Sequence, residues 1–489
     1  MVALALPLLP ATAADRVPHR EAPVEVQLRR AQAYAVRQLA RTDERLGAGR
    51  FPTVAVGDSP WRTSGTNGWL AGFWPGRLWV AYELTGDRHW ARRATTRQAP
   101  LAVRAADRST HDLGFLLQTS FGAGARLTGR TSDRAVLRQA AQSLASRHVP
   151  PAKAIRSWNG PVGQATVIVD SLMNLELLFA AADQGGPAAW RELAREHALT
   201  VARTHVRPDG STFHVARFDE STGQLRWRGT VQGLADGSTW ARGQSWAVHG
   251  FTTAYRETGD PALLEAARRT ADFAVVNLPA DGVPWWDSDA AGTQRDTTAA
   301  AVLASGLLEL ARLDPDAELR AQWRTEGMRV LRSLARPPYL ARGTDAWSVL
   351  LRGRHSPTYA DAGVTYADFY LLEALQRAQL LPAARPARRV ADLRRRSGGG
   401  LRADLGAERW VSAVSVRWRD GDQRATRFVV QVAGDDRRWR TVRRGVSSGR
   451  LTQFETYDLR DRAVRYVRVL PRQAADGTDG RVQAIRVRR

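Results

Sequence analysis

Residues 240–277 read WARGQSWAVHGFTTAYRETGDPALLEAARRTADFAVVN. On both sides of 258–261, apolar residues recur every three or four positions, which is the spacing of two amphipathic helices. Between them, Gly259 suits the left-handed C-cap of the first helix, while Asp260 and Pro261 suit the start of the second. The stretch therefore predicts an antiparallel helix hairpin.

Similar turns separate helical stretches along much of the chain, at 85–87, 128–130, 184–187 and 313–315. Helical spacing predicts about twelve helices in all. They lie near 25–46, 70–84, 88–104, 113–127, 132–146, 167–183, 188–204, 240–257, 261–277, 297–312, 316–334 and 362–379. Six hairpins fit a closed ring whose inner helices line a central pocket, and an open solenoid is the alternative. Long loops between hairpins favour a functional rim on one face.

The composition narrows the classes of protein. With 43% hydrophobic and 25% charged residues in 489, the chain has ordinary globular usage, so a fibrous or membrane-embedded class is not indicated. It contains no cysteine, which excludes disulfides and thiolate chemistry. Lys153 is its only lysine and does not follow a glycine-rich loop, so a Walker-type phosphate site is excluded. The nine histidines show no metal-binding spacing, and we expect neither metal nor cofactor.

Differences in composition and in residue patterning divide the chain into four segments. Residues 1–14 are apolar and contain Ala11-Thr12-Ala13, a small-residue cleavage pattern without the usual basic start, which predicts a truncated signal peptide and a secreted or extracytoplasmic protein. The helical domain is expected at 25–384 and a Pro, Ala, Arg and Gly linker at 385–400. Alternating patterns at 401–489 predict a small β-sandwich.

Positive charge is concentrated after the helical domain. The chain has a formal charge of +23, of which residues 385–489 contribute +15, with 27 arginines and 12 acidic residues. A basic module favours an anionic partner such as an anionic polysaccharide, a charged cell surface or nucleic acid. A general preference of the source for arginine is the alternative explanation.

Two carboxylates are candidates for chemistry. Asp170 lies in the apolar run VIVDSLMNL at 167–175, where an ionised carboxylate is costly unless it is paired or its pKa is raised. Asn174 follows one helical turn later, and a hydrogen-bonded structural carboxylate is the alternative. Asp112 precedes an apolar run and could simply be a helix N-cap. In a helical ring, however, alternate helix starts converge on one face, so Asp112 and Asp170 could meet as an acid and an anion acting on a sugar.

A third cluster runs from Gln232 to Trp246. Arg242 and Trp246 are four residues apart, which predicts a cation beside an aromatic ring that could bind an anionic sugar. Ser238 could cap the helix that carries both residues. The alternative is an arginine stacked on core tryptophan. His214 follows a turn in a rim loop and is by itself an ordinary loop histidine. Further tryptophans suit stacking against pyranose faces, among them Trp69 and Trp158.

Several of these segments occur in the order found in glycoside hydrolase family 88, the unsaturated glucuronyl hydrolases, which the chain resembles from about residue 60 to 378. They are 68–76 (GWLAGFWPG), 111–115 (HDLGF), 169–175 (VDSLMNL), 232–246, 295–300 (RDTTAA) and 363–370 (GVTYADFY). The last segment departs from the family's frequent Gly-Asp-Tyr-Tyr. The resemblance implies an (α/α)6 barrel that removes 4,5-unsaturated hexuronic acid from the non-reducing end of oligosaccharides made by polysaccharide lyases.

The resemblance also implies roles for individual residues. In the family's scheme, the acid matching Asp170 protonates C4 of the enol ether and its carboxylate helps water to add at C5, while Asp112 matches the partner carboxylate. The remaining matches imply substrate-binding residues. These are His214, Gln232, Trp69, Arg242 and Trp246, to which we add Trp158 as a stacking candidate. Contact of Arg242 with a uronate or sulfate group is expected from charge complementarity.

The C-terminal part looks like a shortened discoidin (coagulation factor 5/8 type C) module. The resemblance rests on 403–406 (ADLG), 428–435 (FVVQVAGD), 439–442 (WRTV) and 465–469 (RYVRV). It implies possible carbohydrate binding. Two other functions stay open: an unsaturated rhamnogalacturonyl hydrolase of family 105 acting on pectin fragments, and a non-catalytic surface protein that binds anionic polysaccharide. We expect no nucleic acid partner and no membrane span.

Overall fold

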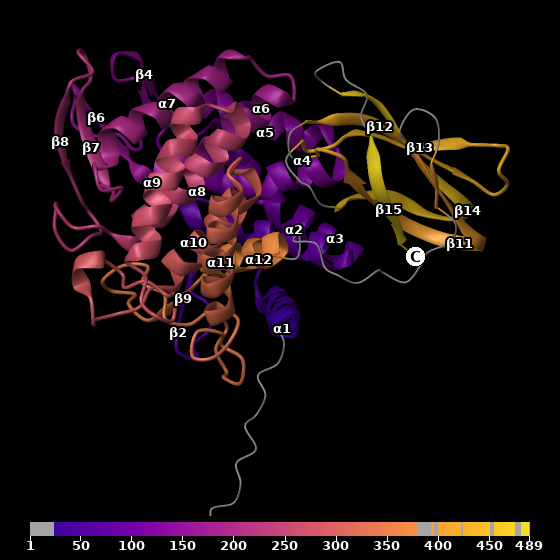
Figure 1. The fold of residues 1–489 in the computed structure, drawn as a ribbon, viewed down its shortest axis with the longest axis horizontal. Coiled ribbons are helices and arrows are strands. Elements are labelled where there is room, and N and C mark those ends of the chain that lie inside the picture. Colours follow the sequence, from indigo (N-terminus) through magenta and orange to yellow (C-terminus); the bar gives the residue numbers. More distant parts are fainter. Residues whose placement is uncertain are drawn as a thin grey trace, which may run out of the picture.

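The computed structural model describes residues 24–378, 393–395, 400–421, 424–449, 454–474 and 481–488. Residues 1–14, with the predicted signal peptide, lie outside this described part, as does most of the predicted linker 385–400. Helices form the larger body and strands the smaller one beside it (Figure 1). No helix in the described part combines the length and apolar character needed to cross a bilayer.

Twelve helical segments of the described chain form a double ring. The inner ring consists of α2 (Phe73–Thr85), a π-helix (Gly114–Gly122) continued by α4 (Ala123–Thr128), a 3₁₀ turn (Val169–Asn174) continued by α6 (Glu176–Asp183), α8 (Ala241–Thr258), α10 (Thr297–Leu313) and α12 (Thr365–Ala378). Each inner segment packs on the next, and α12 packs back on α2. The ring is therefore closed, which confirms the (α/α)6 barrel and excludes the open solenoid.

The outer ring packs against the inner one, each outer helix contacting its neighbour in the hairpin. It consists of α1 (Val24–Arg45), α3 (Arg88–Gln98), α5 (Thr131–Ala145), α7 (Ala189–His205), α9 (Pro261–Val276) and α11 (Ala317–Leu334). The hairpin turns have the expected chemistry. Gly86 and Gly259 adopt φ of 67° as left-handed C-caps, and Asp87 and Asp260 each accept a backbone N–H of the following helix.

The structure corrects three of the predicted helices. The helix predicted at 362–379 begins only at Thr365, because Ala362–Val364 forms a short strand. The stretch predicted as a helix at 167–183 begins with strand β6 (Gln164–Ile168), because this segment pairs with β7 (Val215–Asp219), and becomes helical only at Val169. Strand β8 (Leu225–Gly229) completes this rim sheet. The helix predicted at 88–104 ends at Gln98 and continues as a 3₁₀ helix, Ala99–Ala106, with proline at its start.

Smaller strand pairs complete the rim of the barrel. They are β1 (Phe51–Pro52) with β3 (Thr63–Ser64), β2 (Val54–Val56) with β9 (Ala362–Val364), and β4 (His148–Val149) with β5 (Ala154–Ile155). Figure 1 shows β2, β9 and β6–β8 on the side of the barrel away from the C-terminal strands. The rim and the C-terminal domain therefore lie at different ends of the helical body.

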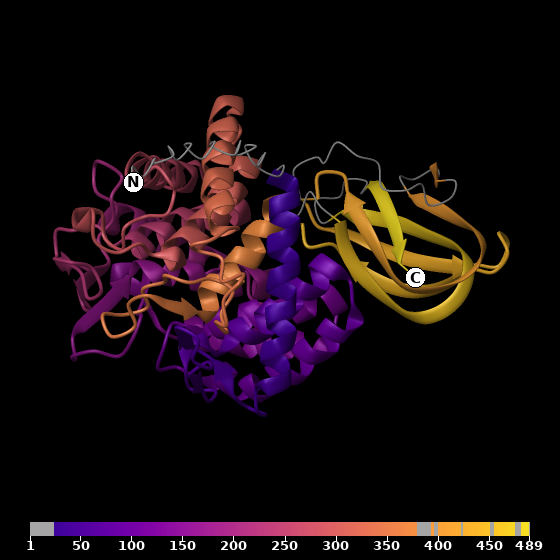
Figure 2. The same cartoon turned by 90° about the horizontal axis from the view of Figure 1, so that it is seen from below.

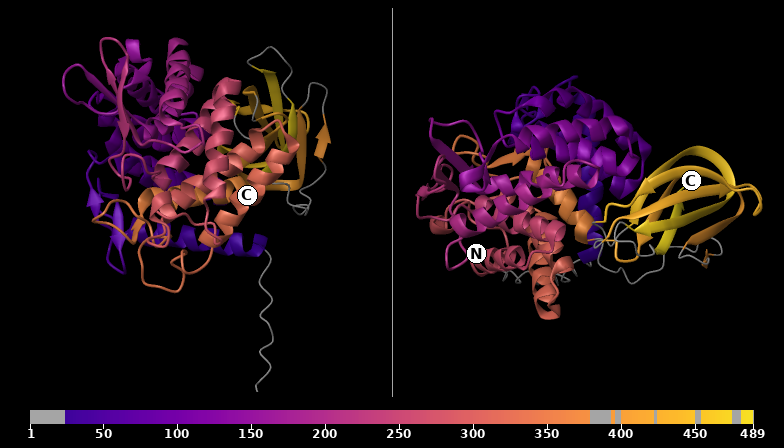
Figure 3. Two further views of the ribbon diagram at one scale, coloured as in Figure 1. Left: turned by 60° about the vertical axis from the view of Figure 1, so that its left-hand side comes forward. Right: turned by 90° about the horizontal axis from the view of Figure 1, so that it is seen from above.

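The C-terminal domain is a single antiparallel sheet with its own apolar core. Its strands are β10 (Leu393–Arg395), β11 (Leu401–Trp418), β12 (Thr426–Ala433), β13 (Arg440–Val446), β14 (Phe454–Ala474) and β15 (Val482–Arg488). The order is β10-β11-β14-β12-β13, with β15 also on β11. Register shifts interrupt the long β11 and β14 ladder, and the sheet curves around its core (Figures 2 and 3). Strand β10 lies inside the predicted linker, and β14 contacts α4 of the barrel.

Candidate active site

The starts of the inner helices meet at one end of the barrel. There, Gly114 packs so closely on the next inner segment that an added Cβ would lie 2.5 Å from Cα of Asn174. The Phe115 amide donates to Oδ1 of Asn174 at 2.8 Å, and Nδ1 of His111 lies 2.9 Å from Oγ of Ser171. Because His111 adjoins Asp112 and Ser171 adjoins Asp170, these contacts bring the two predicted carboxylates to the same region.

Asp170 occupies the first turn of the 3₁₀ segment, directly after β6, and is 8% exposed. Burial raises the pKa of Asp170 to about 7, the charge of Asp112 adds to the rise, and the Arg242 guanidinium opposes it. The Asp170 carboxyl therefore keeps its proton to a much higher pH than an exposed aspartate does. A carboxylic acid with such a pKa can donate its proton near neutrality and function afterwards as a base.

Asp112 is the more accessible carboxylate, with 21% of its side chain exposed. Its Oδ2 accepts the hydroxyl of Thr110 at 2.8 Å, and its Oδ1 lies 3.3 Å from Nε2 of His111. The alternative role of Asp112 as a helix N-cap is not observed, because the side chain accepts from Thr110 and not from the amides of the first turn. The carboxylate is thus held by two side chains at the rim of the site.

His214 faces Asp170 from the start of β7. Its Nδ1 lies 3.2 Å from the Val231 amide and 3.3 Å from the Gln232 amide, so this nitrogen accepts hydrogen bonds and is unprotonated. The proton of the neutral ring must then be on Nε2, which lies 3.6 Å from Oδ2 of Asp170. Burial and the nearby Arg242 charge lower the pKa of His214 to about 3, so the ring is neutral. His214 therefore presents an N–H group to the acid.

Arg242 lies in the first turn of α8 and is buried. It forms an ion pair with Asp296 at 3.5 Å and donates to Oε1 of Gln232 at 2.8 Å. Its other acceptors are Oγ1 of Thr298 and the carbonyls of Arg354 and His355. Both terminal nitrogens are thus committed to protein groups. Arg242 holds several rim segments together and supplies a positive field, while its direct contact with a substrate anion stays a prediction.

The structure corrects the aromatic partner predicted for Arg242. The guanidinium lies over the ring of Trp240, 4.4 Å from its centre, and not over Trp246. Trp246 is completely buried and packs on Phe115 and Tyr366, so it supports the site from the core. Ser238 does not cap α8 either, because its hydroxyl donates to Asp287 at 2.8 Å.

The remaining predicted residues are at least partly exposed. Trp69 is partly exposed in the 3₁₀ turn (Trp69–Gly72) that precedes α2, and it stacks on Tyr366 with ring centres 5.6 Å apart. Trp158 is 37% exposed and forms a backbone bridge with Thr110, the residue that holds Asp112. Gln232 is partly exposed on the loop after β8. Stacking on the two tryptophans stays a prediction.

Sequence reasoning missed three residues of this site. His355 stacks near Trp69, with centres 6.1 Å apart, and burial with the Arg242 charge lowers the pKa of His355 to about 4. Tyr366 supports Trp69, and Trp240 packs on His214 with centres 4.6 Å apart. The helix-start argument could have identified Tyr366 and Trp240, because they stand at the beginnings of α12 and α8. No comparable signal marked His355, which lies in a loop.

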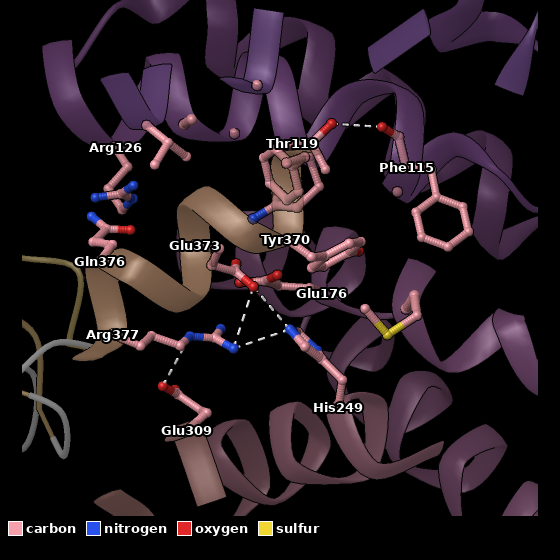
Figure 4. A pocket seen from close by; sticks show the side chains of 18 of the residues that line it. Phe115, Thr119, Arg126, Glu176, His249, Glu309, Tyr370, Glu373, Gln376 and Arg377 are labelled. Atoms are coloured by element: carbon pink, nitrogen blue, oxygen red, sulfur yellow. Dashed lines mark hydrogen bonds and ion pairs between the residues drawn. The ribbon is translucent and has the colours of Figure 1, made fainter. Parts of the chain in front are cut away.

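A cavity of about 130 Å³ lies further along the inner helices (Figure 4). None of the predicted site residues lines it. Instead it is bordered by paired charges. His249 contacts Glu373 at 3.1 Å, and Arg377 joins Glu373 at 3.3 Å and Glu309 at 3.4 Å. These pairs connect α8, α10 and α12 and stabilise the inner ring.

The fold and the site together define the class of protein. A closed (α/α)6 barrel whose helix starts surround a protonatable buried carboxyl, a second carboxylate and exposed tryptophans is the architecture of a carbohydrate-active enzyme.

Comparisons with known proteins give the family. The chain is 35% identical over 351 residues to an unsaturated glucuronyl hydrolase of Formosa agariphila, covering 69% of this chain and 86% of that protein. It is 35% identical to the enzyme of the same name from Bacillus sp. GL1, covering 67% and 90%, respectively. An unsaturated chondroitin disaccharide hydrolase of Streptococcus agalactiae is 31% identical, covering 72% and 92%. The chain belongs to the unsaturated glucuronyl hydrolases, glycoside hydrolase family 88, and is an enzyme.

Comparison with solved structures supports the same family assignment. A crystal structure of an unsaturated glucuronyl hydrolase specific for heparin superimposes with a TM-score of 0.69 at 35% identity, covering 72% of this chain and 97% of that one. The Bacillus sp. GL1 enzyme gives a TM-score of 0.67 at 33% identity, covering 72% and 96%. At residues 396–469, the chain matches the F5/F8 type C family described as a NedA-like, galactose-binding domain. Both predicted resemblances are confirmed.

Proposed function

We propose that Asp170 and Asp112 carry out the hydration of a 4,5-unsaturated hexuronic acid at the non-reducing end of glycosaminoglycan-derived oligosaccharides. The observation that carries this proposal is the burial of Asp170 in the same region as a second carboxylate, Asp112, and this burial raises the pKa of Asp170 to about 7. An enol ether needs a proton on carbon before water can add, and only a group that is still protonated near neutral pH can deliver it. The family relationship supports the same reaction.

In the proposed reaction, Asp170 transfers its proton to C4, and the positive charge that develops at C5 is shared with the ring oxygen. The Asp170 carboxylate then accepts a proton from the water that bonds to C5, so the acid is regenerated. The resulting hemiketal opens by breaking the bond between C5 and the ring oxygen, and the hemiacetal left at C1 expels the remaining saccharide. One water is consumed, and no group is oxidised or reduced.

The surrounding residues assist the charged stages of this reaction. The Nε2–H of His214 faces Oδ2 of Asp170 and would stabilise the carboxylate after proton transfer. The inner helices direct their positive N-terminal ends toward the site, which favours a uronate substrate. Asp112 would orient the sugar hydroxyls, while Trp69 and Trp158 would stack on sugar faces.

The names of the relatives support a glycosaminoglycan source for the substrate. One solved relative is described as specific for heparin, another as responsible for the degradation of glycosaminoglycan, and a Streptococcus agalactiae variant was solved with dGlcA-GalNAc6S. A panel of unsaturated disaccharides from chondroitin, hyaluronan, heparin and pectin tests the assignment. We expect loss of the ultraviolet absorbance of the enol ether with glycosaminoglycan disaccharides. Loss with pectin fragments alone would place the activity with family 105 instead.

The variant Asp170→Asn tests the proposed acid. It should lower kcat by about 10²–10⁴-fold while disaccharide binding, measured by calorimetry, is retained. Asp133→Asn is the matched control, because burial also raises the pKa of Asp133 but this residue lies on α5, outside the site. An active and folded Asp170→Asn protein would remove Asp170 from proton transfer even if the assay confirms the substrate.

We also propose that the protein is exported and that its C-terminal domain binds carbohydrate. The apolar segment before Ala11-Thr12-Ala13 supports export, and N-terminal sequencing of protein recovered outside the cytoplasm should find a start close to Ala14. Recovery of uncleaved protein only from the cytoplasm would contradict it. The match to a galactose-binding family supports carbohydrate binding.

A further inference from the structure

A row of polar side chains crosses the outward face of the C-terminal sheet. The register places Arg402 of β11 opposite Arg468 of β14, Arg468 opposite Gln431 of β12, and Gln431 opposite Thr441 of β13. The Nε of Arg468 donates to Oε1 of Gln431 at 2.8 Å, and Nε2 of Gln431 donates to Oγ1 of Thr441 at 2.9 Å. These bonds hold the Arg468 side chain flat across the strands.

Two aromatic rings lie among the arginines of this face. The guanidinium of Arg468 lies over Trp439, 4.0 Å from the ring centre. Those of Arg402 and Arg465 lie over Tyr466, at 4.7 and 5.0 Å. The two rings are neighbours, with centres 6.3 Å apart. We call these five residues the arginine–aromatic platform.

The platform is accessible and carries net positive charge. Tyr466 is 8% exposed and forms its floor, whereas 43% of the Arg465 side chain is exposed. Arg465 pairs with Asp404 at 3.0 Å and Arg402 with Asp436 at 2.5 Å. Three arginines thus face two carboxylates, and the exposed Arg437, Arg438 and Arg440 add to the positive field. Arg443 of β13, which is not part of the platform, lies beside Gly129 of the barrel.

We propose that the platform binds a strand of anionic polysaccharide through its sulfate or carboxylate groups. Stacked guanidinium groups keep their planes fixed and present N–H groups at their edges, the geometry that carboxylate and sulfate oxygens prefer. The two arginine-bearing strands are about 4.8 Å apart, the scale of one sugar residue. Because the surface is a sheet face of the second domain, it holds polymer independently of the reaction in the barrel. It also adds recognition of anions to a domain whose matched family is described as galactose-binding.

Replacement of the platform arginines in the full-length protein tests this proposal. The triple variant Arg402→Ser, Arg465→Ser, Arg468→Ser is compared with Arg419→Ser, Arg424→Ser, Arg481→Ser, which removes the same charge near the β11–β12 turn and the start of β15. Binding to immobilised heparin and chondroitin sulfate is measured at several salt concentrations. We expect the platform variant to bind at least 10-fold more weakly and the control less than 3-fold more weakly. Equal losses of affinity in both variants would overturn the proposal that the platform is the binding site, because a general effect of charge would then explain the binding.

Arg468→Lys is a second test that preserves charge and folding. Lysine cannot reproduce both the stacking on Trp439 and the Nε bond to Gln431, so binding should weaken about 3- to 10-fold. Unchanged binding would overturn the role of a fixed guanidinium. Turnover of unsaturated disaccharides should be the same in all variants, which separates this proposal from the catalytic one. If duplex DNA at equal charge concentration competes better than heparin, the polysaccharide assignment is wrong.

Discussion

The Nε2 atom of His214 lies 3.6 Å from Oδ2 of Asp170, and within the described part of the chain neither atom has a hydrogen-bond partner. Since Nδ1 of the ring accepts two backbone amides, the proton on Nε2 is fixed by the fold. A shift of about 0.5 Å would convert the contact into a hydrogen bond. Such a bond would favour the Asp170 carboxylate and would therefore assist the proton release proposed for Asp170.

The first prediction concerns the pH dependence of the wild-type enzyme. Because the pKa of Asp170 is about 7 and its protonated form is the proposed acid, kcat/KM for an unsaturated disaccharide should fall as pH rises through about 7. The pKa of His214 is about 3, so titration of this histidine should not change kcat/KM near neutral pH. A rate that stays constant from pH 6 to 9 would contradict the assignment of Asp170.

Removal of the Asp112 charge should shift the pH range in which kcat/KM falls, which is called here the alkaline limb of the pH profile. The charge of Asp112 helps to raise the pKa of Asp170, so Asp112→Asn should lower this pKa and move the limb to lower pH. A pH profile of kcat/KM measured beside the wild type gives the answer. Loss of activity with an unmoved limb would mean that Asp112 only binds the sugar.

The two nitrogens of His214 can be tested separately. In His214→Asn, the amide oxygen can replace Nδ1 as acceptor for the loop amides, so KM should stay similar while kcat falls about 10-fold for one lost hydrogen bond. In His214→Gln, an N–H can still reach Asp170 but the loop carrying Gln232 loses its anchor, so KM should rise. Equal effects of both substitutions on kcat and KM would show that the ring serves only as packing.

How far the sequence could predict this site depends on the kind of interaction. The turn at Gly259 and Asp260 is local chemistry, so the hairpins and the ring could be read directly. Asp170 was recognisable because its apolar neighbours make a charge costly. The aromatic partner of Arg242 could not be predicted in this way. Spacing along a helix indicated Trp246, whereas the guanidinium lies over Trp240. Such choices depend on contacts such as those with Asp296 and His355, which are distant in sequence.

The buried acid should also affect stability. Its pKa near 7 in the folded protein, against about 4 when unfolded, means that the protonated form stabilises the fold fully below pH 4 and that this contribution disappears as pH rises to 7. The difference corresponds to roughly 4 kcal/mol. Asp170→Asn should therefore gain thermal stability relative to the wild type between pH 5 and 8, measured by calorimetry. A Tm difference that does not change with pH would argue against a raised pKa.

Gly114 tests whether the close approach of two inner segments positions the carboxylates. A methyl group there would meet Cα of Asn174 at 2.5 Å and its carbonyl oxygen at 2.8 Å, both backbone atoms that cannot rotate away. Gly114→Ala should push the segment of Asp112 from that of Asp170, lowering the Tm and reducing kcat. Gly65→Ala is the control, because an added Cβ at that position meets nothing within 4 Å. If Gly114→Ala is as active as Gly65→Ala, the separation of the two acids is not set by this contact, and the shared pH limb predicted for Asp112 and Asp170 would need another explanation.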